Sequence, residues 1–81
     1  MTRGQVKEYL RSRGVEFGEI CCIDPGSSNA EITKIGFEVG PWYCTGYDVD
    51  VVFHFTGALA SQDPTDALKK ISIESFPVDC L

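Results

Sequence analysis

Basic residues are almost absent from the middle of this sequence of 81 residues. Between positions 15 and 62 the only lysine or arginine is Lys34, whereas the same segment contains seven aspartates and glutamates. The first 14 residues carry a net charge of +3, the middle segment −6 and the remainder −2, which gives −5 overall. Nucleic acid phosphates repel such a chain and basic protein surfaces attract it, so we expect no direct binding to nucleic acid.

The patterns that build catalytic and metal sites are also missing. The sequence has one histidine, no Cys-x-x-Cys or His-x-x-His spacing, and no glycine-rich loop with the lysine of a phosphate cradle. Cys44 or Cys22 could approach His54 as a nucleophilic pair, but no third orienting group accompanies them. We therefore expect no catalytic residue, no metal and no cofactor, and a Cys/His enzyme is the weakest alternative.

Long hydrophobic runs are missing as well. No apolar stretch has the length of a membrane span, and the opening Met-Thr-Arg-Gly-Gln lacks the hydrophobic stretch of a signal peptide. We therefore expect a cytoplasmic protein with no membrane partner. In a reducing compartment, free thiols are the default for the four cysteines, and adjacent Cys21 and Cys22 should point to opposite faces of a strand.

The chain has no repeat or linker, and its length predicts one domain over residues 1–81. Thr2 followed by Gln5 matches a capping box and Gly14 supplies a left-handed stop, which predicts a helix over residues 3–13. Its apolar face consists of Val6, Tyr9 and Leu10, and its solvated basic stripe of Arg3, Lys7 and Arg11.

Three strands are expected next. Residues 15–23 alternate around Gly18, where a bulge would bring the apolar side chains to one face. After a turn over residues 24–29, strict alternation over 31–39 predicts a strand whose inward side chains are Ile35, Phe37 and Val39. The third strand covers residues 47–56.

A second helix is predicted over residues 64–72, because Asp63 is a strong N-cap and Pro64 follows it at the first helical position. Residues 73–76 form either a short edge strand or an ordered tail. The expected fold class is therefore α+β, in the order α-β-β-β-α with room for a final strand. Its antiparallel three-stranded sheet would carry both helices on one face and leave the other face wet.

The third strand points to a function. On it, Val49, Val51, Phe53 and Phe55 share one face, while Asp48, Asp50 and His54 share the other. If the strands pair as expected, the wet face displays a row of acids with few bases nearby. Asp48 and Asp50 would form its centre, and the candidate flanks are Glu38, Glu31, Glu16, Glu19 and Asp24.

This acidic strand, the capped first helix and the segment Asp63-Pro64-Thr65-Asp66-Ala67-Leu68-Lys69-Lys70 together resemble the small anti-CRISPR proteins of phages and mobile elements, in overall character and without a diagnostic motif. The resemblance implies a monomeric inhibitor in the cytoplasm of a host bacterial cell. It would act as a DNA mimic on the basic DNA-binding or PAM-binding site of a type I Cascade subunit. Carboxylates on a stiff sheet can replace phosphates in such a basic cleft.

Two alternatives remain. The acids are ordinary solubilising charge, or the chain is a non-enzymatic interaction module that docks through exposed aromatics, with Trp42, Tyr43 and Tyr47 as candidates. Salt distinguishes the two binding modes, because an acidic interface weakens steeply as ionic strength rises and an aromatic one does not.

Overall fold

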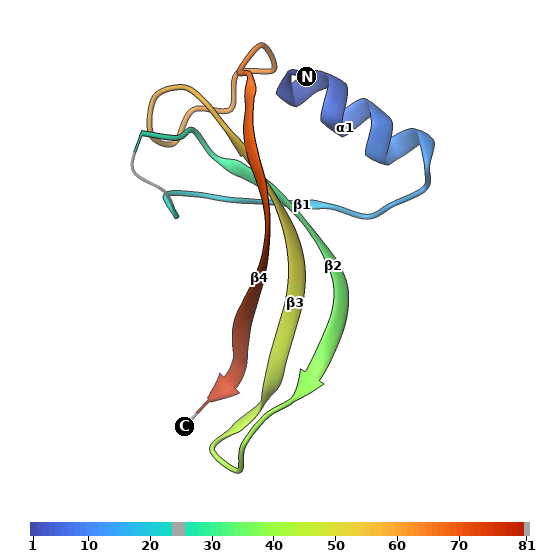
Figure 1. Cartoon of the computed structure of the whole chain (residues 1–81), viewed down its shortest axis with the longest axis vertical. Helices are drawn as coiled ribbons and strands as arrows, with labels where there is room; N and C mark the ends of the chain where they lie inside the picture. Colours follow the sequence, from blue (N-terminus) through green and yellow to red (C-terminus); the bar gives the residue numbers. More distant parts are fainter. Residues whose placement is uncertain (24–25, 81) are drawn as a thin grey trace.

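The computed structural model describes residues 1–23 and 26–80 of the chain. Within them, one helix precedes an antiparallel four-stranded sheet with the strand order β1-β2-β3-β4 (Figure 1). The elements are α1 (Arg3–Ser12), β1 (Gly18–Ile20), β2 (Ala30–Val39), β3 (Cys44–Phe55) and β4 (Leu68–Cys80). The predicted α-β-β-β-α order with two helices on one face is therefore wrong, because the fold is mostly β.

The first helix forms as its sequence predicts. Thr2 Oγ1 accepts a hydrogen bond from the Gln5 backbone N–H at 3.3 Å, and Gln5 Oε1 accepts one from the Thr2 N–H at 2.9 Å, which completes the capping box. Val6 and Leu10 are buried against Phe55 of β3, so the apolar face of α1 covers one end of the sheet. These three residues form the hydrophobic core cluster, and Phe17, Phe53 and Leu68 pack against it.

The predicted second helix is a turn followed by a strand. Asp63 does accept hydrogen bonds from the backbone N–H of Thr65 at 2.9 Å and from its hydroxyl at 2.7 Å, as a helix cap would. The chain then extends, because Ile71 and Ile73 pair with Phe53 and Val51 of β3. Alternation of apolar and polar side chains over residues 70–74 favours a strand, and pairing with β3 outweighs the local start signal.

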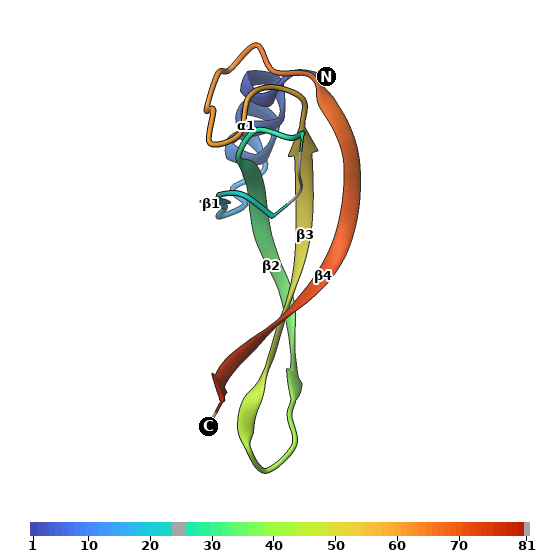
Figure 2. The same cartoon turned by 90° about the vertical axis from the view of Figure 1, so that its left-hand side faces the viewer.

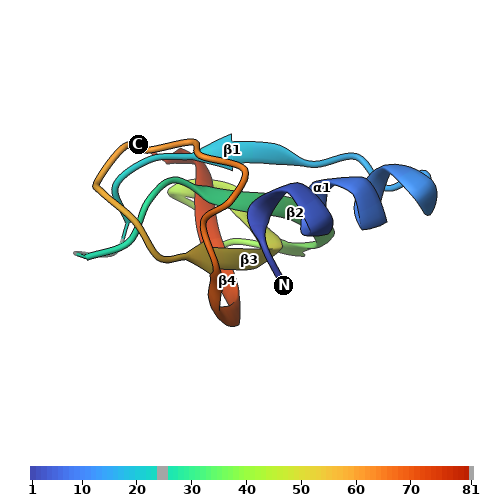
Figure 3. The same ribbon diagram turned by 90° about the horizontal axis from the view of Figure 1, so that it is seen from above.

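The sheet has two unlike faces at the helix end. Seen from above, α1 lies to the right of the strands, and the loops before β2 and β4 extend to the left (Figure 3). Both loops also reach the start of α1, where Arg3 donates hydrogen bonds to the Ser28 hydroxyl and to the Asp66 carbonyl. Phe53 packs toward α1, whereas Val52 and His54, on the opposite face, are 0% and 4% exposed. The face that the alternation predicts as wet is therefore covered here.

Beyond the helix, the other halves of β2, β3 and β4 project as an arm, made of residues 35–49 and 75–80 (Figure 2). Ile35, Phe37 and Val39 are 57%, 46% and 88% exposed, so their predicted inward position is wrong. A register shift between Lys34 and Gly36 interrupts the alternation at Ile35, and no helix of the described residues covers this part of the sheet.

The four cysteines form two disulfides, Cys44–Cys80 between paired positions of β3 and β4, and Cys21–Cys22 just after β1. The expectation of free thiols is therefore wrong. Cys21 and Cys22 do not point to opposite faces of a strand, because β1 ends at Ile20 and Cys22 has a positive φ of 68°. Disulfides are typical of oxidising compartments, so they argue against the expected cytoplasmic location, which stays a prediction.

Candidate functional site

The structure separates the acids of the expected row. Glu31 and Asp50 are only 1% and 6% exposed, so neither presents a carboxylate to a partner. Asp50 lies opposite Lys34 on the neighbouring strand, beside a hollow of 270 Å³ lined also by Phe17. Strand alternation correctly places Asp48 and Asp50 on one face, but it does not reveal that the chain around β1 covers part of that face.

The remaining acids are more accessible but dispersed. Asp48 forms an ion pair with Lys34 at 2.9 Å, and Glu38 lies opposite Tyr47, on the other face of the sheet from Asp48. Glu16 and Glu19 are exposed near β1, where Glu19 Oε1 accepts a hydrogen bond from the Asn29 side chain at 2.6 Å. Asp24 lies outside the described residues. The structure therefore does not gather these acids into one continuous row.

Glu31 belongs to a buried ionic cluster that the sequence does not reveal. Its Oε1 lies 3.5 Å from Arg3 Nη1 and 3.7 Å from Lys7 Nζ. Burial raises the pKa of Glu31, although the nearby charge of Lys7 acts in the opposite direction. The expected basic stripe is therefore wrong at Arg3, which is 1% exposed, and holds at Arg11, which is 59% exposed.

Arg3 ties the helix to three parts of the chain. Its Nη2 donates to the Ser28 hydroxyl at 2.8 Å and to the Asn29 carbonyl, and it lies 3.7 Å from Asp66 Oδ2. Its guanidinium carbon is 4.6 Å from the centre of the Phe55 ring. Since every one of these partners is part of the same chain, the cluster serves to hold α1 in place.

The nucleophilic pair of His54 with Cys44 or Cys22 would need a free thiol, and neither cysteine has one in this structure. His54 Nε2 lies 2.8 Å from the Ser72 hydroxyl, while Cys44 and Cys22 are both in disulfides. Among residues 1–23 and 26–80, no group of three or more His, Cys, Asp or Glu side chains could hold a metal ion.

The aromatic candidates lie at the end of the arm. Trp42 and Tyr43 are in the β2–β3 turn, with 88% and 45% of their surface exposed, and their rings meet edge to face at 5.6 Å. We call these two residues the aromatic tip. Tyr47, the third candidate, is half-buried on β3 and belongs to the adjoining arm.

Two turn hydrogen bonds and a disulfide hold the aromatic tip in place. The Gly40 N–H donates to the Thr45 carbonyl at 3.2 Å, and the Cys44 N–H donates to the Pro41 carbonyl at 3.0 Å. The Cys44–Cys80 disulfide then joins the base of the turn to β4. The two hydrogen bonds within the turn and the disulfide at its base together hold the aromatic tip in one orientation.

Apolar side chains continue from the tip along one face of the arm. The Phe37 ring lies directly over Gly46, where a Cβ atom would overlap it. Val39 and Val78 both pair with Gly46, so they flank the ring on this face. The arm therefore offers apolar surface next to the two exposed aromatics.

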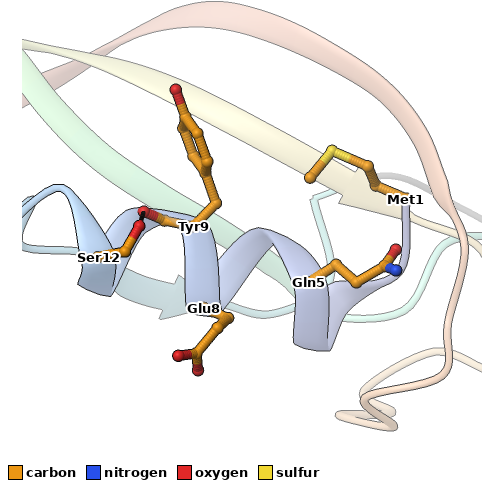
Figure 4. A pocket seen from close by; sticks show the side chains of 5 residues that line it. All are labelled: Met1, Gln5, Glu8, Tyr9 and Ser12. Atoms are coloured by element: carbon orange, nitrogen blue, oxygen red, sulfur yellow. Dashed lines mark hydrogen bonds between the residues drawn. The ribbon is translucent and has the colours of Figure 1, made fainter.

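A pocket along the first helix lacks converging polar groups. This pocket has a volume of 410 Å³ and is lined by Met1, Gln5, Glu8, Tyr9 and Ser12 (Figure 4). Glu8 and Tyr9 point to opposite sides of the helix, and Ser12 donates to the Tyr9 carbonyl at 2.7 Å. A binding pocket for a small molecule has a few polar groups aimed at one point, which this one does not.

Within the described part of the chain, no helix is long and apolar enough to cross a membrane. Comparisons of the chain with protein-family models, with curated proteins and with solved structures gave no match.

Proposed function

We propose that this protein is a non-enzymatic interaction module that binds a partner protein through its aromatic tip. The observation that carries the proposal is the 88% exposure of Trp42 at the end of a braced arm. Tryptophan and tyrosine, together with arginine, are enriched among the residues that dominate binding energy at interfaces. An exposed pair with apolar side chains beside it is the kind of surface that a partner covers.

The bracing of the tip favours binding. Association normally loses free energy because side chains and loops become ordered at the interface. The two turn hydrogen bonds and the Cys44–Cys80 disulfide impose that order before a partner arrives. A partner would therefore meet a preformed aromatic edge.

The composition of the aromatic tip also indicates what kind of surface the partner has. The segment from Val39 to Tyr47 contains no charged residue. The complementary surface would be an apolar pocket large enough for an indole ring, with polar groups at its rim. Because no charge lies at the centre of this contact, salt should change its affinity very little.

The test is affinity capture from a bacterial lysate at low and at high salt, with three baits: the wild-type protein, Trp42→Ala, and a double variant Glu38→Gln/Asp48→Asn. We expect a protein that the wild type and the acid variant retain at both salt concentrations and that Trp42→Ala loses. Direct titration of that protein with each bait would then give the affinities. Capture that survives Trp42→Ala would contradict the proposal.

The DNA-mimic inhibitor is a second proposal, supported by the net charge of −5 and by the exposed Glu16, Glu19 and Glu38. It predicts binding to a purified type I effector complex that high salt abolishes and that Glu38→Gln/Asp48→Asn weakens. The buried Asp50 and Glu31 would take no direct part. The same three baits therefore separate the two proposals.

A further inference from the structure

We propose that two copies of this chain associate through the outer edges of their β4 strands, antiparallel and centred on Ser72. The two sheets would join into one continuous sheet. A second copy is the partner because the sequence of this edge is complementary to itself.

The β4 edge is available for pairing. β4 is the last strand in the sheet order, so among the described residues no strand adjoins its outer edge over Ile71–Phe76. At one end, Met1 occupies the edge by accepting a hydrogen bond from the Leu68 N–H at 2.7 Å. At the other end stands Pro77, which has no N–H to donate. Met1 and Pro77 therefore limit further strand pairing at this edge to the residues between Leu68 and Pro77, with Ser72 near the middle.

Charges on this stretch match across a twofold axis. When two antiparallel β4 strands are centred on Ser72, Lys70 of each copy lies opposite Glu74 of the other. Lys70 and Glu74 are both exposed. Directly opposed unlike charges stabilise an antiparallel pair, and like charges weaken it. The twofold axis produces this match twice.

Apolar side chains match in the same register. Ile71 lies opposite the Ile73 of the second copy, and the axis again repeats the contact. Ile71 and Ile73 are 57% and 68% exposed in the single chain. Ile71 also lines a wholly apolar pocket of 230 Å³ between α1 and the sheet, with Tyr9 and Leu68. The four isoleucines would extend this apolar surface across the junction.

Neighbouring registers lose the complementarity. A shift that centres the pair on Ile71 places Lys70 opposite Ser72, and one that centres it on Ile73 places Glu74 opposite Ser72. A twofold contact of this kind also closes on itself, so it produces a dimer and no filament. On the other side of the sheet, β1 is three residues long and pairs only with residues 30–32 of β2.

Charge reversal tests both the association and its register. Wild-type protein should sediment at twice the chain mass of 8.9 kDa. Lys70→Glu or Glu74→Lys alone turns both opposed pairs into like charges, and should raise the dissociation constant about tenfold or more. An equimolar mixture of the two variants restores unlike charges at both positions, so it should form a mixed dimer.

Glu8→Lys and Arg13→Glu are matched controls. They change the net charge by the same amounts as Glu74→Lys and Lys70→Glu, but at exposed positions of α1 and its C-cap. Circular dichroism and the melting temperature of each variant establish that it folds. The proposal is overturned if the folded wild type is monomeric at several hundred micromolar, or if the mixture of reversed variants dissociates as readily as each alone.

Discussion

Replacing Arg3 with methionine should destabilise the protein severely. Arg3 is 1% exposed, and its guanidinium reaches the carboxylates of Glu31 and Asp66 at 3.5 and 3.7 Å. Methionine keeps much of the apolar contact with Phe55 but removes both ion pairs and the hydrogen bonds to Ser28 and Asn29. Glu31 would then be buried with Lys7 as its remaining basic neighbour.

The size of the loss follows from that stranded carboxylate. Removing one partner of a buried ion pair costs about 3–5 kcal/mol. A small domain has about 5–15 kcal/mol of stability in total, so Arg3→Met removes a large fraction. Each kcal/mol corresponds to about 4–8 °C in the melting temperature of a domain of this size, which gives a fall of at least about 12 °C.

Urea and thermal unfolding, followed by circular dichroism, measure this loss. Arg11→Met is the matched control, because its ion pair with Glu8 is exposed and is worth about 0–1 kcal/mol. Adding Glu31→Gln to Arg3→Met removes the stranded charge and should recover part of the stability. If Arg3→Met unfolds at the same urea concentration as Arg11→Met, the ionic cluster does not hold α1 as argued.

Three further predictions concern Glu31, Gly46 and the disulfides. Burial raises the pKa of Glu31 above 4.5, so its contribution to stability is complete below that pH and declines as the pH rises through the raised pKa. Over that range, the unfolding free energy of the wild type should therefore fall relative to that of Glu31→Gln. Parallel pH profiles of the two proteins would contradict this prediction. Gly46→Ala should cost about 1–3 kcal/mol in urea unfolding, because its Cβ would overlap the Phe37 ring. Gly36→Ala, with its nearest neighbour at 4.0 Å, is the control and should have little effect. Replacing Cys44 and Cys80 with serine should cost about 4 kcal/mol, since that disulfide spans a sequence separation of 36, whereas the same change at adjacent Cys21 and Cys22 should cost much less; equal losses would refute the chain-entropy argument.

Local signals in the sequence predict the first helix and the central strand well. The Thr2–Gln5 capping box depends on residues three positions apart, and alternation from residue 46 to 55 follows from strand geometry alone. The same kind of signal fails at Asp63. Its side chain caps a turn in the manner expected, but whether a helix or strand follows depends on β3, which is distant in the sequence.

The candidate site was predicted only in part. The exposed positions of Trp42 and Tyr43 follow from their place beside Gly40 and Pro41, because a turn at the end of a hairpin has little chain to cover it. The burial of Asp50 and Glu31 could not be foreseen, since other segments cover them. Arg3 shows the same limit, because its spacing on α1 matches a wet stripe while its environment is set by residues 28, 29, 31 and 66.

The anchoring of α1 has a consequence for synthesis on the ribosome. The helix leaves the exit tunnel before the strands, and the side chains that receive it, including Phe55 and Leu68, are translated only much later. Until then Val6 and Leu10 have no surface to pack on, and the positive charge of Arg3 stays hydrated. The nascent chain should therefore form its hairpins before α1 packs onto them, although α1 is synthesised before every strand that it contacts.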